Sequence, residues 1–291
     1  MIYLLLIPVL LILAFVGAIH LGFRAPRLNN DVHPSAHGMN YQAHNVVGQQ
    51  GSKLSVWWIE AEQPSDTTVV IMHGWGANKS LLLPLAKPFH ETGYNVLMLD
   101  AHNHGDSESR GVSTMPKFAE DVTSAVSWLQ TSAPETCQKT VVVGHSVGAA
   151  AVLLATANGL KTDVVISLAS FVHPKLMMQR SLQKVKAVPG LIWLISNYVQ
   201  WVIGHKFDVI APITSLANIQ QPTLLVHGAE DSVIPLSDFE VLCDAHQNEW
   251  IKCLEIPEAD HDSIDKIEAH FRELDAFIKQ HITLNSESKV G

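Results

Sequence analysis

The chain has 291 residues and a formal net charge of −9, and no stretch of it concentrates Lys and Arg. This acidic balance argues against a nucleic-acid partner. Hydrophobic residues make up 47% of the chain and charged residues only 16%, a low charged share for a soluble domain, which indicates at least one unusually apolar segment. The three cysteines, Cys137, Cys243 and Cys253, have no metal-type spacing and are odd in number. They predict no disulfide framework and favour a reducing compartment.

The apolar excess lies mostly in residues 2–23, which contain no charged side chain. As a helix, this run would be about 33 Å long at about 1.5 Å per residue, enough to cross a bilayer. Residues 1–23 are therefore predicted to be a transmembrane anchor or a signal segment. Arg24 and Arg27 follow the run, which favours a retained anchor with the rest of the chain in the cytoplasm. The alternative is export after signal-peptide cleavage behind Ala18, although no basic residue precedes the run.

Residues 24–51 are predicted to be a linker with room for one irregular strand, and residues 286–291 a tail. Between them, residues 52–285 alternate apolar runs with amphipathic stretches. The runs predict strands over 54–61, 68–73, 94–100, 140–144, 163–169, 222–228 and 250–256, and the stretches predict helices over 80–91, 116–131, 147–158, 238–246 and 263–281. Continuous apolar runs that alternate with helices are typical of the α/β class, with a mostly parallel sheet and helices on both faces.

Residues 171–205 interrupt this alternation with two helical patterns, and the second is strongly apolar. It is short for a second membrane span, and Ser196, Asn197 and Gln200 break its apolar character. Insertions after sheet strands often cover an active site, so a small helical cap over a pocket is the preferred interpretation. Its aromatic residues, Trp193, Tyr198 and Trp201, either line that pocket or pack the cap onto the domain.

The stretch from Gly144 to Gly148 reads G-H-S-V-G, between a run of valines and a helical pattern. In a G-x-S-x-G elbow the serine occupies a sharp strand-to-helix turn, and both flanking positions must be very small. The following helix also points free N–H groups at the site. Ser146 is therefore predicted to be a nucleophile rather than a serine in an ordinary tight turn.

A serine hydroxyl needs a base, and the base needs an orienting carboxylate. Asp231 follows one predicted strand and His261 follows the next, in the order that this chemistry requires. The neighbouring carboxylates, Glu230, Asp260 and Asp262, are weaker candidates for the acid.

An acyl-transfer site also needs two donors for the developing oxyanion. The backbone N–H of Val147 is one candidate, because it follows the nucleophile. The N–H of Trp75 is the other, in a strand-end loop where Gly74 allows close approach of the backbone. His73 is predicted to hold that loop by a hydrogen bond rather than to transfer protons.

The chain resembles the α/β-hydrolase fold superfamily over roughly residues 52–281. The shared motifs are H-G-W-G, L-D-A-H-N-H-G-D-S, G-H-S-V-G, F-D-V-I-A-P-I, P-T-L-L-V-H-G-A-E-D-S-V-I-P and A-D-H-D-S-I. Carried over, the resemblance implies Ser146 as nucleophile, Asp231 as acid and His261 as base, with oxyanion donors at Trp75 and Val147. It implies no cofactor and a small-molecule acyl substrate. Asn103 departs from the family pattern, as does the N-terminal apolar segment.

Within this superfamily, the apolar cap favours a carboxylic ester with a hydrophobic acyl group, and thioesters and amides remain alternatives. Two rival interpretations stay open. His102, His104 and Asp106 have the H-x-H-x-D spacing of a metal loop, which could recruit His173, His227 or His261. A membrane-anchored binding protein without catalysis is the second rival, although such proteins usually lack a residue of the triad.

Overall fold

The computed structural model describes the backbone of residues 2–245 and 250–287. One eight-stranded sheet organises it, with the strand order β1-β2-β4-β3-β5-β6-β7-β8. The strands are β1 (Gln42–Val47), β2 (Lys53–Ile59), β3 (Thr67–Met72), β4 (Asn95–Leu99), β5 (Lys139–His145), β6 (Val164–Leu168), β7 (Thr223–Gly228) and β8 (Ile251–Ile256). Strand β2 pairs antiparallel with both β1 and β4, and every later pair is parallel. The predicted α/β class with a mostly parallel sheet is confirmed.

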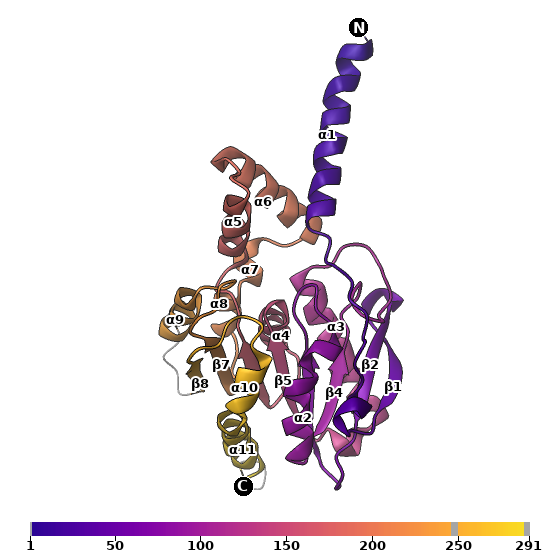
Figure 1. Cartoon of the computed structure of the whole chain (residues 1–291), viewed down its shortest axis with the longest axis vertical. Coiled ribbons are helices and arrows are strands. Elements are labelled where there is room, and N and C mark those ends of the chain that lie inside the picture. Colours follow the sequence, from indigo (N-terminus) through magenta and orange to yellow (C-terminus); the bar gives the residue numbers. More distant parts are fainter. Residues whose placement is uncertain (1, 246–249, 288–291) are drawn as a thin grey trace.

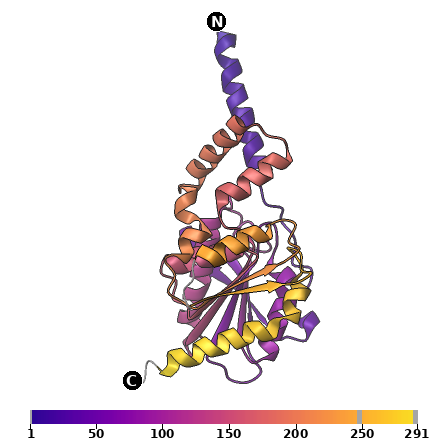
Figure 2. The ribbon, with the colours of Figure 1, turned by 90° about the vertical axis from the view of Figure 1, so that its left-hand side faces the viewer.

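Helices cover both faces of the sheet, and further helices project beyond one end of it (Figures 1 and 2). The helices are α1 (Ile2–Gly22), α2 (Leu83–Glu91), α3 (Met115–Ser132), α4 (Val147–Ala157), α5 (Pro174–Lys184), α6 (Pro189–Ile203), α7 (Phe207–Ile210), α8 (Pro212–Leu216), α9 (Leu236–Ala245), α10 (Ile264–Ala269) and α11 (Phe271–Glu287). Apolar residues of α3, α4, α8 and α9 cover one face, and those of α2, α10 and α11 cover the other. All six residues of β3 are buried, with Val69 facing the second layer and Val70 the first. A continuous apolar run therefore becomes a strand that packs on both sides.

Residues 24–51 differ from a free linker. They contain β1, and the part before it is held against the domain. Arg27 Nε donates to the carbonyl of Gly105 at 2.8 Å, and Asn78 Nδ2 donates to the carbonyl of Asn29 at 2.8 Å. Little apolar periodicity marks this segment in the sequence, because its contacts are polar and come from distant loops.

The C-terminal region also differs from the prediction. In place of one helix over 263–281, the structure has two helices, α10 and α11, that meet at His270. Helix α11 continues to Glu287, inside the predicted tail of 286–291, and residues 288–291 lie outside the described part of the chain. The cap over 171–205 contains the two predicted helices, α5 and α6.

The C-terminal end of α1 lies beside α6 of the cap (Figure 1). A hydrogen bond of 2.9 Å joins His20 Nε2 to the hydroxyl of Tyr198, and Ile19 is buried in the core cluster that includes Ile195. Among the residues that the structure describes, no helix is long and apolar enough to cross a membrane. The prediction that residues 1–23 form a transmembrane anchor is therefore not supported by the described residues.

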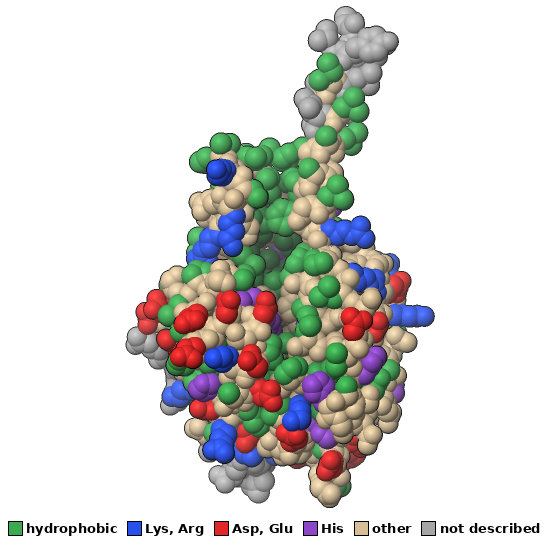
Figure 3. All heavy atoms as spheres, in the orientation of Figure 1, with side chains coloured by type: hydrophobic (Ala, Val, Ile, Leu, Met, Phe, Trp, Pro, Cys, Tyr) green, Lys and Arg blue, Asp and Glu red, His purple; other side chains and the backbone are tan. Residues whose placement is uncertain are grey.

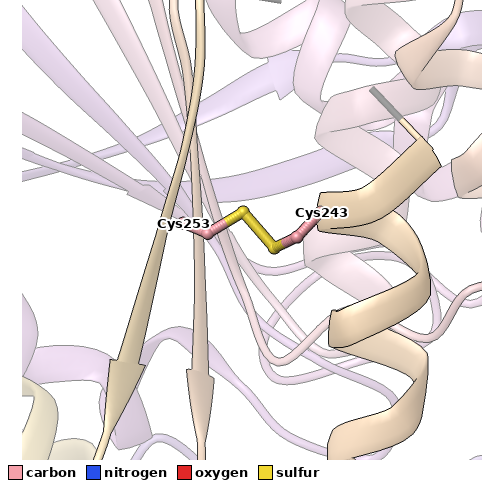
Figure 4. Close-up of a disulfide and its surroundings, with 2 residues drawn as sticks. All are labelled: Cys243 and Cys253. Atoms are coloured by element: carbon pink, nitrogen blue, oxygen red, sulfur yellow. A yellow bond between two sulfur atoms is a disulfide. The ribbon is translucent and has the colours of Figure 1, made fainter. Parts of the chain in front are cut away.

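The three cysteines form no framework but do include one disulfide, which their pattern in the sequence did not predict. Cys243 on α9 and Cys253 on β8 form a disulfide with their Cα atoms 6.3 Å apart (Figure 4), whereas Cys137 is free and buried. The two positions are only 10 residues apart, but their pairing depends on how α9 packs against the edge strand β8. The odd count excluded a fully paired set and did not exclude a single bridge.

Candidate active site

Ser146 stands alone between β5, which ends at His145, and α4, which begins at Val147. Its backbone has φ 56° and ψ −118°, a strained combination for a residue with a side chain. A Cβ atom added at Gly144 would lie 2.2 Å from the carbonyl oxygen of Gly148. One added at Gly148 would lie 2.4 Å from the carbonyl oxygen of His73. Only glycine fits at these two positions, so the sequence G-x-S-x-G forms the sharp elbow that it predicts.

The three residues predicted for the triad meet at this elbow. His261 Nε2 lies 2.9 Å from Ser146 Oγ, and His261 Nδ1 lies 2.7 Å from Asp231 Oδ2. All three side chains are largely buried. Asp231 follows β7 and His261 follows β8, and these strands pair in parallel, so their carboxyl ends deliver both side chains to one edge of the sheet. The arrangement places a hydroxyl, an imidazole and a carboxylate in one hydrogen-bonded chain.

The environment of Asp231 keeps this carboxylate ionised. Burial alone would raise its pKa, but the hydrogen bond from His261 and the backbone N–H groups of Ile234 and Val233 together lower the pKa below its usual value. The two N–H groups donate to Oδ1 at 2.7 and 2.8 Å, which leaves Oδ2 for His261. A carboxylate held in this way fixes the imidazole ring with Nδ1 as donor and Nε2 as acceptor.

Asp260, a weaker candidate for the acid, has a different role. Its Oδ1 accepts from the backbone N–H and the hydroxyl of Ser232 at 2.8 and 2.9 Å, and from the backbone N–H of His261 at 2.7 Å. These bonds to Ser232 and His261 lower the pKa of Asp260. Asp260 thus ties the loop that carries Asp231 to the loop that carries His261. The sequence signal for it is only that it precedes the histidine.

The two predicted oxyanion donors lie beside Ser146. Val147 is the first residue of α4, and Gly74 approaches so closely that a Cβ atom there would lie 3.0 Å from the Cβ of Ser146. The backbone bonds around them use the N–H of Ala77, Gly76 and Ala150. Within the described chain, the N–H groups of Trp75 and Val147 have no hydrogen-bond partner. Two free donors next to a serine Oγ suit a developing negative charge.

A buried ion pair supports the loop that carries Trp75. Lys79 Nζ lies 2.5 Å from Asp100 Oδ2, and both side chains are fully buried. Burial alone would raise the pKa of Asp100, but the charge and hydrogen bonds of Lys79 hold it below its usual value. The ammonium also lies 4.6 Å from the ring centroid of Trp57. Nothing local in the sequence distinguishes Lys79 from a surface lysine.

Two buried histidines, His73 and His145, also hold the loops around Ser146. His73 donates from Nδ1 to the carbonyl of Gly74 and accepts at Nε2 from the N–H of Ala101, and burial lowers its pKa to about 4. These bonds are those of a structural histidine. His145 donates from Nε2 to the carbonyl of His261 at 2.8 Å, and burial together with the charge of His261 lowers its pKa to about 4. At neutral pH both rings are neutral and hold the loops around Ser146.

The H-x-H-x-D loop does not gather its side chains around a common point. His102 Nδ1 lies 2.7 Å from Asp121, His104 accepts from the N–H of Gly76, and Asp106 lies beside Lys79. The other histidines considered for this site, His173 and His227, bond to Asp208 and to the carbonyl of Ile234. Among the described residues, one group of three potential ligands lies close together, His145, His261 and Asp262. It contains the imidazole that already bonds to Ser146 and Asp231.

A large cavity opens onto Ser146 and His261. It has a volume of about 940 Å³ and lies between the sheet domain, the cap and the end of α1. Its walls are mostly apolar and include Phe23, Phe171, Met177, Tyr198, Val199, Ile203 and Phe207. Figure 3 shows this hollow between the cap and α1, lined by hydrophobic side chains, with a histidine visible in its depth. A volume near the upper end of ordinary ligand pockets suits a large apolar substrate.

Comparisons with known proteins agree with this architecture. The protein YfhR of Salmonella typhimurium is 28% identical over 245 residues, covering 80% of this chain and 78% of its own. An sn-1-specific diacylglycerol lipase of Xenopus laevis, ABHD11, is 35% identical over 81 residues, 28% of this chain and 24% of its own. The structure of Pyrococcus furiosus esterase Pf2001 superposes with a TM-score of 0.73 at 22% identity, covering 89% of this chain and 99% of that one.

The family model described as Hydrolase_4, serine aminopeptidase S33, matches residues 63–212. This range includes the loop of Trp75, the elbow at Ser146 and the cap. The chain belongs to this family of hydrolases, built on the α/β-hydrolase fold.

Proposed function

We propose that this chain is a serine hydrolase that cleaves a carboxylic ester through an acyl-enzyme. Ser146 is the nucleophile, His261 the general base and Asp231 the carboxylate that orients the base. The observation that carries the proposal is the hydrogen-bonded chain from Ser146 Oγ to His261 at 2.9 Å and from His261 to Asp231 at 2.7 Å. The strained backbone of Ser146 supports it, because the strain exposes Oγ to a substrate.

In the first half-reaction, His261 Nε2 accepts the proton of the Ser146 hydroxyl while Oγ attacks the carbonyl carbon of the ester. The oxyanion accepts hydrogen bonds from the N–H groups of Val147 and Trp75. His261 then gives its proton to the departing alcohol, and the acyl group stays on Oγ. Water, activated by the same imidazole, attacks the acyl-enzyme and releases the acid. Asp231 stabilises the imidazolium throughout and does not take its proton.

The lining of the cavity favours an apolar acyl ester over a peptide with a free N-terminus. A free α-amino group is cationic at neutral pH, and its recognition needs carboxylates. The described lining contains one carboxylate, that of Asp262, and three guanidinium groups, those of Arg24, Arg27 and Arg110. The names of two similar proteins, a diacylglycerol lipase and an esterase, point the same way. Thioesters share the same acyl chemistry, so a matched thioester belongs in the substrate series.

A fluorophosphonate probe tests the mechanism. The wild-type protein is expected to be labelled at Ser146, and labelling is expected to vanish in Ser146→Ala. Ser167→Ala is the matched control, because Ser167 is also a buried serine and its hydroxyl has no partner among the described residues. Labelling that persists in Ser146→Ala would refute the assignment. Esters of increasing acyl length, assayed with and without EDTA, then measure the preference for apolar chains and separate this chemistry from a metal-dependent one.

We also propose that residues 2–23 hold the chain at a membrane and that the catalytic domain works in an oxidising compartment. The first part is supported by the uncharged sequence of this segment. The second part replaces the cytoplasmic expectation and is supported by the disulfide between Cys243 and Cys253, because disulfides persist mainly outside the cytosol. Maleimide labelling of denatured protein from unreduced cells is expected to reach Cys137 only. Labelling of all three cysteines would refute the oxidising compartment.

A further inference from the structure

The end of the molecule at the mouth of the cavity is unusually apolar. It consists of residues 2–30 and 171–206, which include α1, α5 and α6, and we call it the apical surface. Of the 20 large hydrophobic side chains exposed in the described chain, 13 belong to it. Trp193 and Trp201 on α6 are 68% and 76% exposed, and Leu21 on α1 is 73% exposed. Figure 3 shows hydrophobic side chains gathered over the cap and α1. Exposed hydrophobic side chains that gather at one end of a molecule mark an interaction site.

The charge of the apical surface is opposite to that of the rest of the protein. It contains seven of the 19 basic residues and none of the 28 acidic ones, although the chain as a whole has a net charge of −9. The basic residues are Arg24, Arg27, Lys175, Arg180, Lys184, Lys186 and Lys206. Arg180 is paired with Asp238 of the domain, and the four cap lysines are exposed. Basic side chains around exposed tryptophans and leucines are typical of surfaces that bind anionic bilayers.

The apical surface is continuous with the wall of the catalytic cavity. Ile19 and Phe23, at the end of α1 and just after it, and Tyr198 and Ile203 from α6 line the same cavity as Ser146. The bond between His20 and Tyr198 joins the two walls at the mouth. An acyl chain that leaves a bilayer on this side would meet apolar side chains along its path to the nucleophile.

We propose that the apical surface docks on an anionic lipid bilayer and that the substrate is an acyl ester of a membrane lipid, drawn directly from the bilayer into the cavity. The docking part stands on the exposed apolar residues, the basic charge and the position of the cavity mouth. The substrate part rests on the proposed function of Ser146. A soluble substrate would gain nothing from exposed tryptophans, whereas a lipid substrate reaches the cavity only if its mouth contacts the membrane.

Docking is tested without catalysis, in the full-length Ser146→Ala protein. Vesicles of brominated phosphatidylcholine and phosphatidylglycerol quench tryptophans that enter the acyl region. Because two of the seven tryptophans are exposed on α6, emission is expected to fall by roughly a quarter. The conservative double variant Trp193→Phe/Trp201→Phe should lose most of this quenching. Trp250→Phe should keep it, since Trp250 is also exposed but lies immediately before β8, outside the apical surface. Equal quenching in the double variant, or none in the parent, would overturn the docking.

Substrate supply is tested in the active enzyme. Trp193→Glu/Trp201→Glu should lower hydrolysis of a diacyl lipid in anionic vesicles about 10-fold, because carboxylates oppose insertion into an anionic interface. Hydrolysis of a soluble acetate ester should stay within about twofold, and Trp250→Glu should match wild type on both substrates. Equal rates of the double variant and wild type on vesicles would overturn the proposal, as would an equal loss on both substrates. If no ester were hydrolysed at all, the proposed function would fail while the quenching experiment still decided the docking.

Discussion

The edge of the sheet that carries the proposed triad and the cap are built by different means. At the edge, Ser146, Asp231 and His261 are buried and joined by hydrogen bonds, and Asp260 and His145 hold the loops around them. In the cap, α6 exposes Trp193 and Trp201 to solvent. The proposed reacting groups are thus placed by polar bonds, whereas the exposed face of α6 is apolar and sparsely bonded. Chemistry and substrate choice can therefore be altered separately.

Removal of the buried ammonium group of Lys79 is expected to have the largest effect, a loss in the free energy of unfolding. Lys79→Met leaves Asp100 charged and without its ion-pair partner, and should lower the free energy of unfolding by about 3–5 kcal/mol. Urea denaturation measures it. Lys139→Met is the matched control, since Lys139 pairs with Asp66 at 3.8 Å near the surface and should cost at most about 1 kcal/mol. Similar losses in both variants would mean that the buried pair does not support the edge.

The free energy of unfolding should depend on pH partly through two buried histidines, His73 and His145, that lie near Ser146. The pKa of His145 falls from 6.5 to about 4 on folding, so the unfolded state binds a proton between these values and the folded state does not. Stability is therefore fully present above pH 6.5 and declines as pH falls toward 4. His145→Gln keeps a donor for the carbonyl of His261 and removes the titration.

Thermal denaturation between pH 7 and 4 checks this expectation. The wild type should lose up to about 3 kcal/mol more than His145→Gln over the range. His73 has a similarly lowered pKa and remains in both proteins, so part of the decline should persist. Identical profiles of the two proteins would show that His145 does not titrate as the structure requires.

Removal of the Asp260 side chain, which joins the loops of Asp231 and His261, is expected to have a smaller effect, on kcat alone. Asp260→Ala frees the N–H groups of Ser232 and His261 and should lower kcat about 10-fold, because small misplacements of a catalytic base are costly. KM should change little, since Asp260 is absent from the cavity lining. Steady-state kinetics with a soluble ester measure both, and Asp265→Ala is an exposed control on α10. A raised KM with unchanged kcat would place Asp260 in substrate binding instead.

The smallest effect is expected from loss of the ion pair between Arg180 and Asp238, which ties the cap to the domain. Arg180 donates from both terminal nitrogens to Asp238, at 2.9 and 2.6 Å. Arg180→Gln should raise KM for long-chain esters a few-fold and leave kcat for an acetate ester unchanged, because the tether places the cap and not the nucleophile. Ester kinetics at two chain lengths separate these outcomes. An equal loss on both esters would show that cap and edge are not independent.

Much of the fold could be predicted from the sequence because its signals are local. The valines of β5 and the helical pattern of α4 mark the elbow, and the glycines at 144 and 148 follow from the space around them. The sequence could predict that Asp231 and His261 lie close together, because each follows one of two neighbouring parallel strands whose carboxyl ends meet at one edge of the sheet.

Other features could not be predicted in this way. Asp260 resembled an alternative acid, and only the three N–H and O–H groups around its Oδ1 reveal that it ties two loops. The pairing of Cys243 with Cys253 depends on how α9 packs against β8, which no local pattern shows. Residues 24–51 resembled a linker, since the partners of Arg27 and Asn29 come from loops far along the chain.

The sequence by itself determined the strands, the elbow and the order of the proposed triad residues, because steric limits and apolar patterns act between near neighbours. The tertiary structure decided which carboxylate reaches His261, which lysine is buried beneath the Trp75 loop, and which two cysteines meet. It also decided that α1 and α6 both line the cavity and are joined by a hydrogen bond. These outcomes depend on contacts between residues tens to hundreds of positions apart, whose distances in space are set only when the layers pack.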